Sequence, residues 1–437
     1  MSAKRFSRRS SRVTFDTARQ KVLEARQATV SGRYREAIDL TQAGLALLDD
    51  FSPSPEQSRI RFDLLLERGR ARRLIGDYAS LADFQAVRNE STDPAQRAAA
   101  LVGIGECYSG TGDYIAAENA FHLALEEGEA GGLALCLIRS WSGLGTLYWK
   151  QGRIEEAVQA LLKARVALQK TPDVYELGHV LVSLGIAHNY AGRLDRAMAA
   201  YEEALSCFRT LGDEHRVAAV LNNLGEVYQE LGDVEQALTY HQEAVGIASR
   251  AGARRMEIDI TRNVGVDLLM MGRYNEAMAN LHQALAWARE LGDKDLILQA
   301  LYSLGDALLR QGDAGRALEV AGELAAEAQA VRSGLHAARA RYLQGRAHLS
   351  RGDRAAAQAT LQTALADAHA VTSRVLLWQL HAALGRATDD LNLAQVHFRI
   401  AADFIHQTVE PLTDPRLRAR FLEQLEVRAV LERAEPG

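Results

Sequence analysis

The residues best suited to chemistry are scattered along this chain and form no catalytic or metal-binding motif. Twelve histidines and three cysteines are present, but there is no HExxH for zinc, no GxxxxGKS or GxxxxGKT loop for phosphate, and no GxSxG nucleophile motif. Cys107, Cys136 and Cys207 lie in apolar stretches without a CxxC pair, which favours inert thiols over nucleophiles, metal ligands or disulfides. We therefore expect no enzymatic activity, no cofactor and no metal site.

Several histidines fall at positions that the chain also fills with packing residues. His122 and His282 occupy equivalent positions in similar stretches of sequence, and His241 stands where other stretches have Phe121 and Tyr201. Histidine is intermediate in its preference for burial, so it is compatible with a partly buried packing position. These histidines are interpreted as structural.

The charge balance provides no extended surface for nucleic acid. The formal net charge is −5, and one basic cluster stands at the start of the chain. Its members are Lys4, Arg5, Arg8, Arg9 and Arg12. Residues 1–14 are predicted to be a disordered basic tail, because short basic tails without aromatic partners for bases are typically solvated. Nucleic-acid binding through residues 1–12 is the less favoured alternative.

Composition also bears on the compartment. The chain has no stretch of ~18 apolar residues, and its basic start is not followed by an apolar segment, so neither a membrane span nor a secretory leader is predicted. The odd number of cysteines fits a reducing compartment, and the cytoplasm is expected. Arginine outnumbers lysine 45 to 6, which is typical of a bacterial protein from a GC-rich genome.

Two glycines recur with a period of 40 residues, and the elements that must position any functional side chain follow this period. The first series consists of Gly112, Gly152, Gly192, Gly232, Gly272, Gly312 and Gly352. The second, seven residues earlier in each unit, consists of Gly105, Gly145, Gly185, Gly225, Gly265, Gly305, Gly345 and Gly385. Self-similarity of this kind indicates a stacked repeat fold.

Each unit is predicted to contain two helices joined by a glycine turn. A glycine such as Gly112, followed by Asp113 and a helical stretch, is typical of a residue that ends a helix with positive φ. Alanines follow at Ala117 and Ala124, where a larger side chain would hold the helices apart. The earlier glycine lies within the first helix, so its repetition predicts close approach of a second helix. We call the helix before the turn helix A and the one after it helix B.

The order of these positions resembles the tetratricopeptide repeat. The segment LNNLGEVYQELGDVEQALTYHQEAVGIA, from Leu221 to Ala248, is most similar to the long-repeat branch of kinesin light chains and Pins-type adaptors. The usual repeat has ~34 residues, whereas this one has 40. The resemblance covers residues 15–410 and implies an all-α, right-handed superhelical solenoid of about ten helix-turn-helix repeats.

The end of the chain departs from the repeat. Residues 411–437 are predicted to form one C-terminal capping helix and a short tail. The apolar residues Leu417, Phe421, Leu422 and Leu425 form a face suited to cover the exposed end of a stack.

In tetratricopeptide proteins the A helices line a concave groove that holds a partner polypeptide, and the resemblance places this groove at fixed positions around the earlier glycine. The residues implied are Arg139, Ser142, Thr146, His179, Ser183, Asn189, Asn222, Asn223, Glu226, Arg262, Asn263, Tyr302 and Asp306. Asn222, Asn223 and Asn263 resemble the asparagine ladder with which long-repeat adaptors grip a peptide main chain; asparagines on a solvated face are the alternative. An extended segment and a helix both remain possible occupants.

The sequence therefore predicts a non-enzymatic scaffold or adaptor that binds a partner polypeptide in this groove. The alternative is a bacterial regulatory receptor for a signalling peptide, or the helical arm of a transcription regulator. The first ~14 residues are too short for the DNA-binding domain that such regulators carry, which favours the adaptor.

Overall fold

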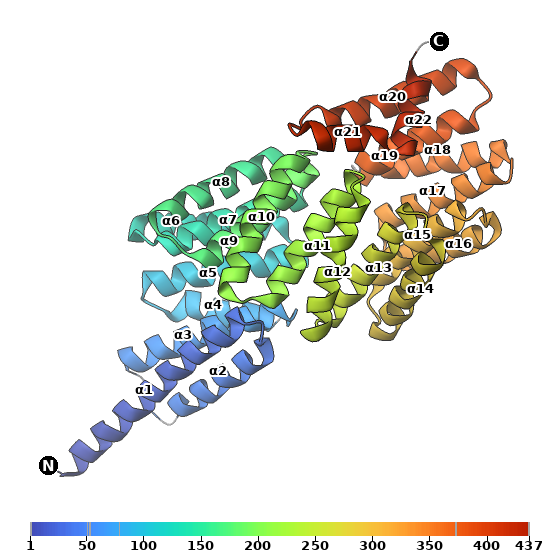
Figure 1. Ribbon diagram of the computed structural model, residues 1–437. Helices are drawn as coiled ribbons and strands as arrows, with labels where there is room; N and C mark the ends of the chain where they lie inside the picture. Colours follow the sequence, from blue (N-terminus) through green and yellow to red (C-terminus); the bar gives the residue numbers. More distant parts are fainter. Residues whose placement is uncertain (1, 50, 52–53, 78, 372–373, 436–437) are drawn as a thin grey trace. The chain divides into compact units, whose positions relative to one another are not determined.

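A computed structural model describes residues 2–49, 51, 54–77, 79–371 and 374–435. This part of the chain forms twenty-two α-helices and contains no strand. The first twenty helices alternate as helix A and helix B of ten successive pairs (Figure 1), which confirms the predicted all-α repeat solenoid. The chain divides into two compact units.

Unit 1 consists of residues 1–191 and 203–213. Its complete helices are α1 (Ser2–Val30), α2 (Tyr34–Asp49), α3 (Pro55–Leu74), α4 (Ser80–Glu90), α5 (Pro94–Thr111), α6 (Tyr114–Gly131), α7 (Ala134–Lys150), α8 (Ile154–Lys170) and α9 (Val174–Tyr190). A hydrophobic cluster runs from Ala18 in α1 to Ala120 in α6. The backbone of α1 is helical from Ser2, upstream of residue 15, where the array is predicted to begin. The side chains of the basic cluster within residues 1–12 lie outside the described part.

Unit 2 consists of residues 192–202 and 214–437, and α10 (Leu194–Leu211) contributes to both units. Its other helices are α11 (Glu214–Glu230), α12 (Val234–Arg250), α13 (Arg254–Met270), α14 (Tyr274–Leu291), α15 (Lys294–Arg310), α16 (Ala314–Ala330), α17 (Gly334–Ser350), α18 (Arg354–Val371), α19 (Arg374–Ala387), α20 (Leu391–Val409), α21 (Pro415–Glu423) and α22 (Leu425–Ala434). A hydrophobic cluster of leucines and alanines extends from Leu238 in α12 to Leu343 in α17.

The turn glycines end helices as the sequence predicts. Gly152 has a φ of 76°, in the left-handed region that glycine adopts without a Cβ clash. The N–H of Gly152 donates to the carbonyl of Trp149 at 3.0 Å, and the N–H of Arg153 donates to the carbonyl of Tyr148 at 2.9 Å. These bonds satisfy carbonyls left open at the end of α7 and direct the chain into α8.

The earlier glycines permit close contact between helices A and B. A Cβ placed on Gly145 would lie 2.4 Å from Cγ of Leu161, and a Cβ on Gly345 would lie 2.5 Å from Cγ of Leu361. Both leucines are fully buried. Fully buried alanines form the other side of these contacts at Ala117, Ala124, Ala157, Ala164, Ala197, Ala204, Ala237, Ala244, Ala277, Ala284, Ala317, Ala357 and Ala364. The two columns therefore fix the spacing within each pair.

The C-terminal segment differs from the single capping helix expected from the sequence. It forms two short helices, α21 and α22, separated at Gln424, whose ψ of 131° is extended. Leu425, predicted to lie on the buried apolar face, is 77% exposed, whereas Val427 and Val430 are buried. The break is accompanied by a bond from the Gln424 side chain to a distant helix, described below.

Among the helices described, none is long and apolar enough to cross a membrane.

Candidate functional site

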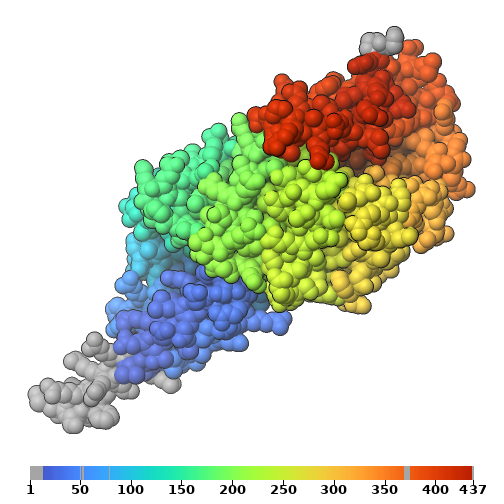
Figure 2. Space-filling view, in the orientation of Figure 1, coloured from blue at the N-terminus to red at the C-terminus, as the bar shows by residue number. Residues whose placement is uncertain are grey.

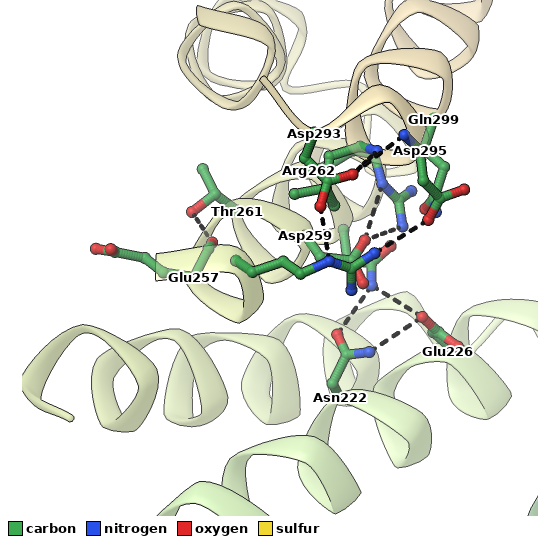
Figure 3. A network of polar contacts seen from close by, with 12 residues as sticks. Asn222, Glu226, Glu257, Asp259, Thr261, Arg262, Asp293, Asp295 and Gln299 are labelled. Carbon is green, nitrogen blue, oxygen red and sulfur yellow. Dashed lines mark hydrogen bonds and ion pairs between the residues drawn. The ribbon is translucent and has the colours of Figure 1, made fainter. Parts of the chain in front are cut away.

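The A helices α11 and α13 of unit 2 are joined by a network of side-chain amides and a carboxylate (Figure 3). Nδ2 of Asn263 donates to Oδ1 of Asn222 at 2.9 Å and to Oε1 of Glu226 at 3.1 Å. Nδ2 of Asn222 also donates to Oε1 of Glu226, at 3.1 Å. These three residues, here called the amide network, bring together predicted site residues that lie 37 to 41 positions apart in sequence.

The predicted asparagine ladder takes a different form in the structure. Asn263 is only 2% exposed, and its two amide hydrogens are directed at Asn222 and Glu226. Its role is thus to hold α11 against α13, rather than to present an amide to a peptide main chain. Asn223, in contrast, is partly exposed and makes no side-chain hydrogen bond within the described residues. Its amide is the member of the ladder that remains available to a ligand.

Charged residues of α13 continue the polar surface beside the amide network. Nη2 of Arg262 lies 2.9 Å from Oδ1 of Asp259, one helical turn earlier. Figure 3 shows Asp259 and Arg262 beside Asp293, at the start of α15. Nε of Arg255 lies 2.8 Å from Oδ2 of Asp293. The side chain of Arg262 is 15% exposed, so the guanidinium is held in place and still reached by solvent.

Glu226 and Glu230 lie one turn apart on α11 and have insufficient positive charge around them. Burial, followed by repulsion from Asp259, raises the pKa of Glu226, and attraction to Arg262 only partly offsets this. Burial and repulsion from Glu226 raise the pKa of Glu230 to about 7. Among the described residues neither carboxyl forms a salt bridge, so the pair is an acidic site that favours a positively charged group from outside.

A second cluster of charged and aromatic residues lies on α15 and α17. Oδ2 of Asp306 accepts a bond from Nε of Arg310 at 2.9 Å, and Oδ1 accepts one from Arg346. Burial disfavours ionisation of Asp306, but the two guanidinium groups outweigh it and hold its pKa at about 2. Tyr302, a predicted site residue, is covered by the guanidinium of Arg339 at 4.9 Å. We call Tyr302, Asp306, Arg310, Arg339 and Arg346 the Asp306 cluster.

Sequence reasoning missed three residues of these surfaces. Arg346 follows Gly345 as Asp306 follows Gly305, so extending the groove positions by one more repeat would have found it. Glu230 stands five residues after Gly225, outside the positions taken from the family. The sequence signal for Glu230 is its position four residues after Glu226, which places the two carboxyl groups on the same face of a helix. The third, Arg310, lies at the same position in its own repeat.

Buried polar contacts below the surface support α11 and α13. Nδ1 of His241 lies 2.6 Å from Oδ2 of Asp267, and both side chains are fully buried. Nε2 of Gln229 donates to Oδ1 of Asp267 at 2.7 Å. A Cβ on Gly225 would lie 2.4 Å from Nε2 of His241, so the imidazole packs directly on the A helix. The structure thus gives His241 the packing position that the sequence predicted.

The predicted residues of unit 1 form their own contacts between α7 and α9. Nη2 of Arg139 lies 2.6 Å from Oε1 of Glu176, which is buried. Thr146 and Ser183 place their hydroxyl oxygens 3.5 Å apart. Thr146 and Ser183 are therefore brought together across neighbouring A helices, whereas Arg139 pairs with Glu176, which lies outside the predicted set.

The remaining predicted residues of unit 1 have varied surroundings. The ring of His179 lies edge-on to that of Tyr175, with centroids 4.5 Å apart. Asn189 has a buried side-chain oxygen without a hydrogen-bond partner among the described residues. Ser142 is partly exposed and makes no side-chain polar contact within that same part of the chain. The polar contacts described for unit 1 join residues in pairs, whereas those of unit 2 form connected clusters.

The described residues provide little for nucleophilic or metal chemistry. Burial raises the pKa of the thiols of Cys107, Cys136 and Cys207, which disfavours the reactive thiolate. Across the parts of the chain described, no group of three or more His, Cys, Asp or Glu side chains is arranged to hold a metal ion. The clusters are suited to hydrogen bonding and ion pairing with a ligand.

Comparisons with known proteins agree with this fold. Models of the tetratricopeptide repeat match residues 96–170, 176–250, 257–326 and 338–363. A Rap protein complexed with Competence and Sporulation Factor has a similar structure, with a TM-score of 0.62, 16% identity, and coverage of 91% of this chain and 100% of that chain. The apo form of the quorum sensor NprR from B. thuringiensis also has a TM-score of 0.62, with 15% identity and coverage of 80% and 99%. At these identities the likeness concerns the fold.

No curated protein matches the sequence. The tetratricopeptide models nevertheless cover more than half of the 437 residues, in register with the helix pairs and glycine turns of the structure. The chain belongs to the tetratricopeptide repeat family.

Proposed function

We propose that this protein is a non-enzymatic scaffold that binds a partner polypeptide on the A-helix face of unit 2. The observation that carries the proposal is that the amide of Asn223, which has no intramolecular hydrogen bond among the described residues, lies next to the ordered amide network. The amide network holds Glu226 and Asn222 in place, while neighbouring Asn223 remains unbonded. An amide donates and accepts at once, as a peptide main chain requires.

The charge on this face indicates which partner segments fit. Glu226 and Glu230 lack matching cations, so a lysine or arginine of the partner would relieve their repulsion. The Asp306 cluster supplies guanidinium groups and one aromatic ring, that of Tyr302, two and three A helices beyond α11. A segment that carries a cation toward α11 and an acidic or aromatic side chain toward α15 and α17 is therefore favoured.

A second candidate function is a regulatory receptor that responds to a signalling molecule. It is supported by the fold shared with a Rap protein crystallised with Competence and Sporulation Factor and with the quorum sensor NprR. A receptor would use the same face, but its ligand would be a short diffusible segment and not part of a larger protein. Competition by short synthetic peptides for the captured partner distinguishes the two.

The test is affinity capture from the native host with the wild type and Asn223→Ala, followed by titration of the purified partner. We expect Asn223→Ala to weaken partner binding about five- to tenfold, because one or two hydrogen bonds to the ligand are lost. The matched control is Asn275→Ala, on the exposed start of α14 and far from the A-helix row. Equal affinity for the Asn223 variant and the wild type would remove this face from the binding site.

A further inference from the structure

The segment between α20 and α22 crosses back onto the repeat array of unit 2. We call residues 410–426 the strap; they comprise the turn after α20, helix α21 and the start of α22. Oγ1 of Thr413 donates to Oδ2 of Asp195, in the first turn of α10, at 2.7 Å. Nη1 of Arg420 lies 3.7 Å from Oδ1 of Asp233 and 3.6 Å from Oε2 of Glu235, at the start of α12.

The tip of the strap reaches the turn between α11 and α12. Nε2 of Gln424 donates to the main-chain carbonyl of Glu230 at 3.0 Å. Its aliphatic part packs on Gly232, where an added Cβ would lie 2.8 Å from Cγ of Gln424. In Figure 2 the C-terminal segment, coloured red, lies against the yellow-green surface of these helices. The strap thus contacts the C-terminal end of α11 at the main chain of Glu230.

The strap also reaches the Asp306 cluster. Oε1 of Glu426 lies 3.5 Å from Nη2 of Arg310, whose Nε is bonded to Asp306. The strap therefore provides with its own side chains the contacts that the face offers to a partner. Arg420 meets carboxylates, Gln424 meets a main-chain carbonyl, and Glu426 meets a guanidinium.

These contacts differ in kind from those that hold α22. The side chains of Val427 and Val430 in α22 are buried, and the end of α22 is tied to α20 by a bond of 2.9 Å from Nε2 of Gln395 to the carbonyl of Ala434. The strap has two buried apolar side chains, Leu412 before α21 and Phe421 within it. Its polar contacts to the array lie close to solvent, and exposed ion pairs contribute little stability. A nine-residue helix such as α21 is also marginal without its packing partners.

We propose that residues 410–424 of the strap form a reversible closure, hinged at Gln424, which must leave the array before a partner polypeptide can contact the C-terminal end of α11. Glu426 lies beyond the hinge in α22 and stays on the Asp306 cluster. That a partner polypeptide binds after the strap has opened rests on the proposed function. The opening of the strap does not depend on it. The anchored helix α22 keeps the strap close to its binding position on the array. The strap therefore competes with the partner at a high effective concentration. The partner's affinity is accordingly reduced by the fraction of molecules that are closed.

The test measures access to residue 230 in the full chain. Glu230→Cys places a thiol on the residue whose main-chain carbonyl binds the strap, and its alkylation by N-ethylmaleimide is followed by peptide mass spectrometry. In the strap-open variant, Arg420→Ala with Gln424→Ala, we expect alkylation of this thiol at least tenfold faster than with the native strap. The control is Arg418→Ala with Glu423→Ala, two exposed strap residues without side-chain contacts to the array among the described residues.

Two further readouts keep the outcomes distinct. The buried Cys136 and Cys207 must remain unlabelled, and amide hydrogen exchange of α20 must stay as in the wild type, which excludes general unfolding. Exchange in residues 412–424 is expected to be at least tenfold faster in the strap-open variant alone. Unchanged alkylation and exchange in that variant would overturn the closure.

Partner binding then separates this inference from the proposed function. The partner purified by capture is expected to bind the strap-open variant at least threefold more tightly than the wild type. Tighter binding that is insensitive to Asn223→Ala supports the closure and refutes the proposed site. Binding that depends on Asn223 but not on the strap supports the site and refutes the closure.

Discussion

Glu230 shows how a single residue links the folded state to pH. Its pKa is raised from an ordinary value of 4.5 to about 7 by burial and by the charge of Glu226. Between these two pH values the folded protein retains a proton that the unfolded chain has released. The free energy of unfolding therefore falls as the pH rises from about 4.5 to 7, and the destabilisation is complete above that range.

Replacing this carboxyl should remove its share of the pH dependence. We expect Glu230→Gln to raise the free energy of unfolding of unit 2 by about 1 to 3 kcal/mol at pH 8, after allowance for partial exposure, and by nearly nothing at pH 4. Urea unfolding followed by circular dichroism at both pH values measures the difference. A gain of the same size at pH 4 and pH 8 would show that the carboxyl titrates normally in the folded protein.

The functional residues could be predicted only in part from the sequence. The spacing of the glycines locates Asn222, Glu226 and Asn263 on facing A helices, and the structure joins these residues. That Asn263 is buried, whereas Asn223 is free, depends on the rotation of α13 against α11, which no pattern in a single sequence specifies. Long-range packing therefore decides which asparagine is structural.

At the scale of the element, the helix pairs follow from local rules. Each turn glycine with positive φ ends a helix, and earlier glycines such as Gly145 and Gly345 allow the next helix to approach. Both kinds of position repeat every 40 residues, which is why the ten pairs could be predicted from the sequence. The break at Gln424 could not, because it accompanies a bond to Glu230, 194 residues away.

Two glycines within helices should respond oppositely to the same substitution. Gly345→Ala places a methyl group 2.5 Å from Cγ of Leu361, so we expect a loss of about 1 to 3 kcal/mol from overpacking. Gly322→Ala, in α16, meets nothing within 4 Å and should gain up to about 1 kcal/mol from helix propensity. Thermal and urea unfolding measure both changes. A stabilising Gly345→Ala would contradict the close approach of α17 and α18.

At the scale of the whole molecule, most contacts join neighbouring helices, as in other repeat proteins. The strap is different, because it ties residues 194 and 218 positions apart within unit 2. A stack of repeats presents a long surface, and a ligand can reach only the part of it that no other segment of the chain covers. In unit 2 a segment of the same chain therefore occupies the edge of a polar face.

The most direct test of this account is site-specific photocrosslinking in the native host. A photoreactive benzoylphenylalanine is introduced at position 223 on the A-helix face or at position 275 on α14. We predict a covalent adduct with a discrete partner polypeptide from position 223, with a higher yield in the strap-open variant, and none from position 275. Adducts from position 275 alone, or equally from both positions, would contradict binding on the A-helix face.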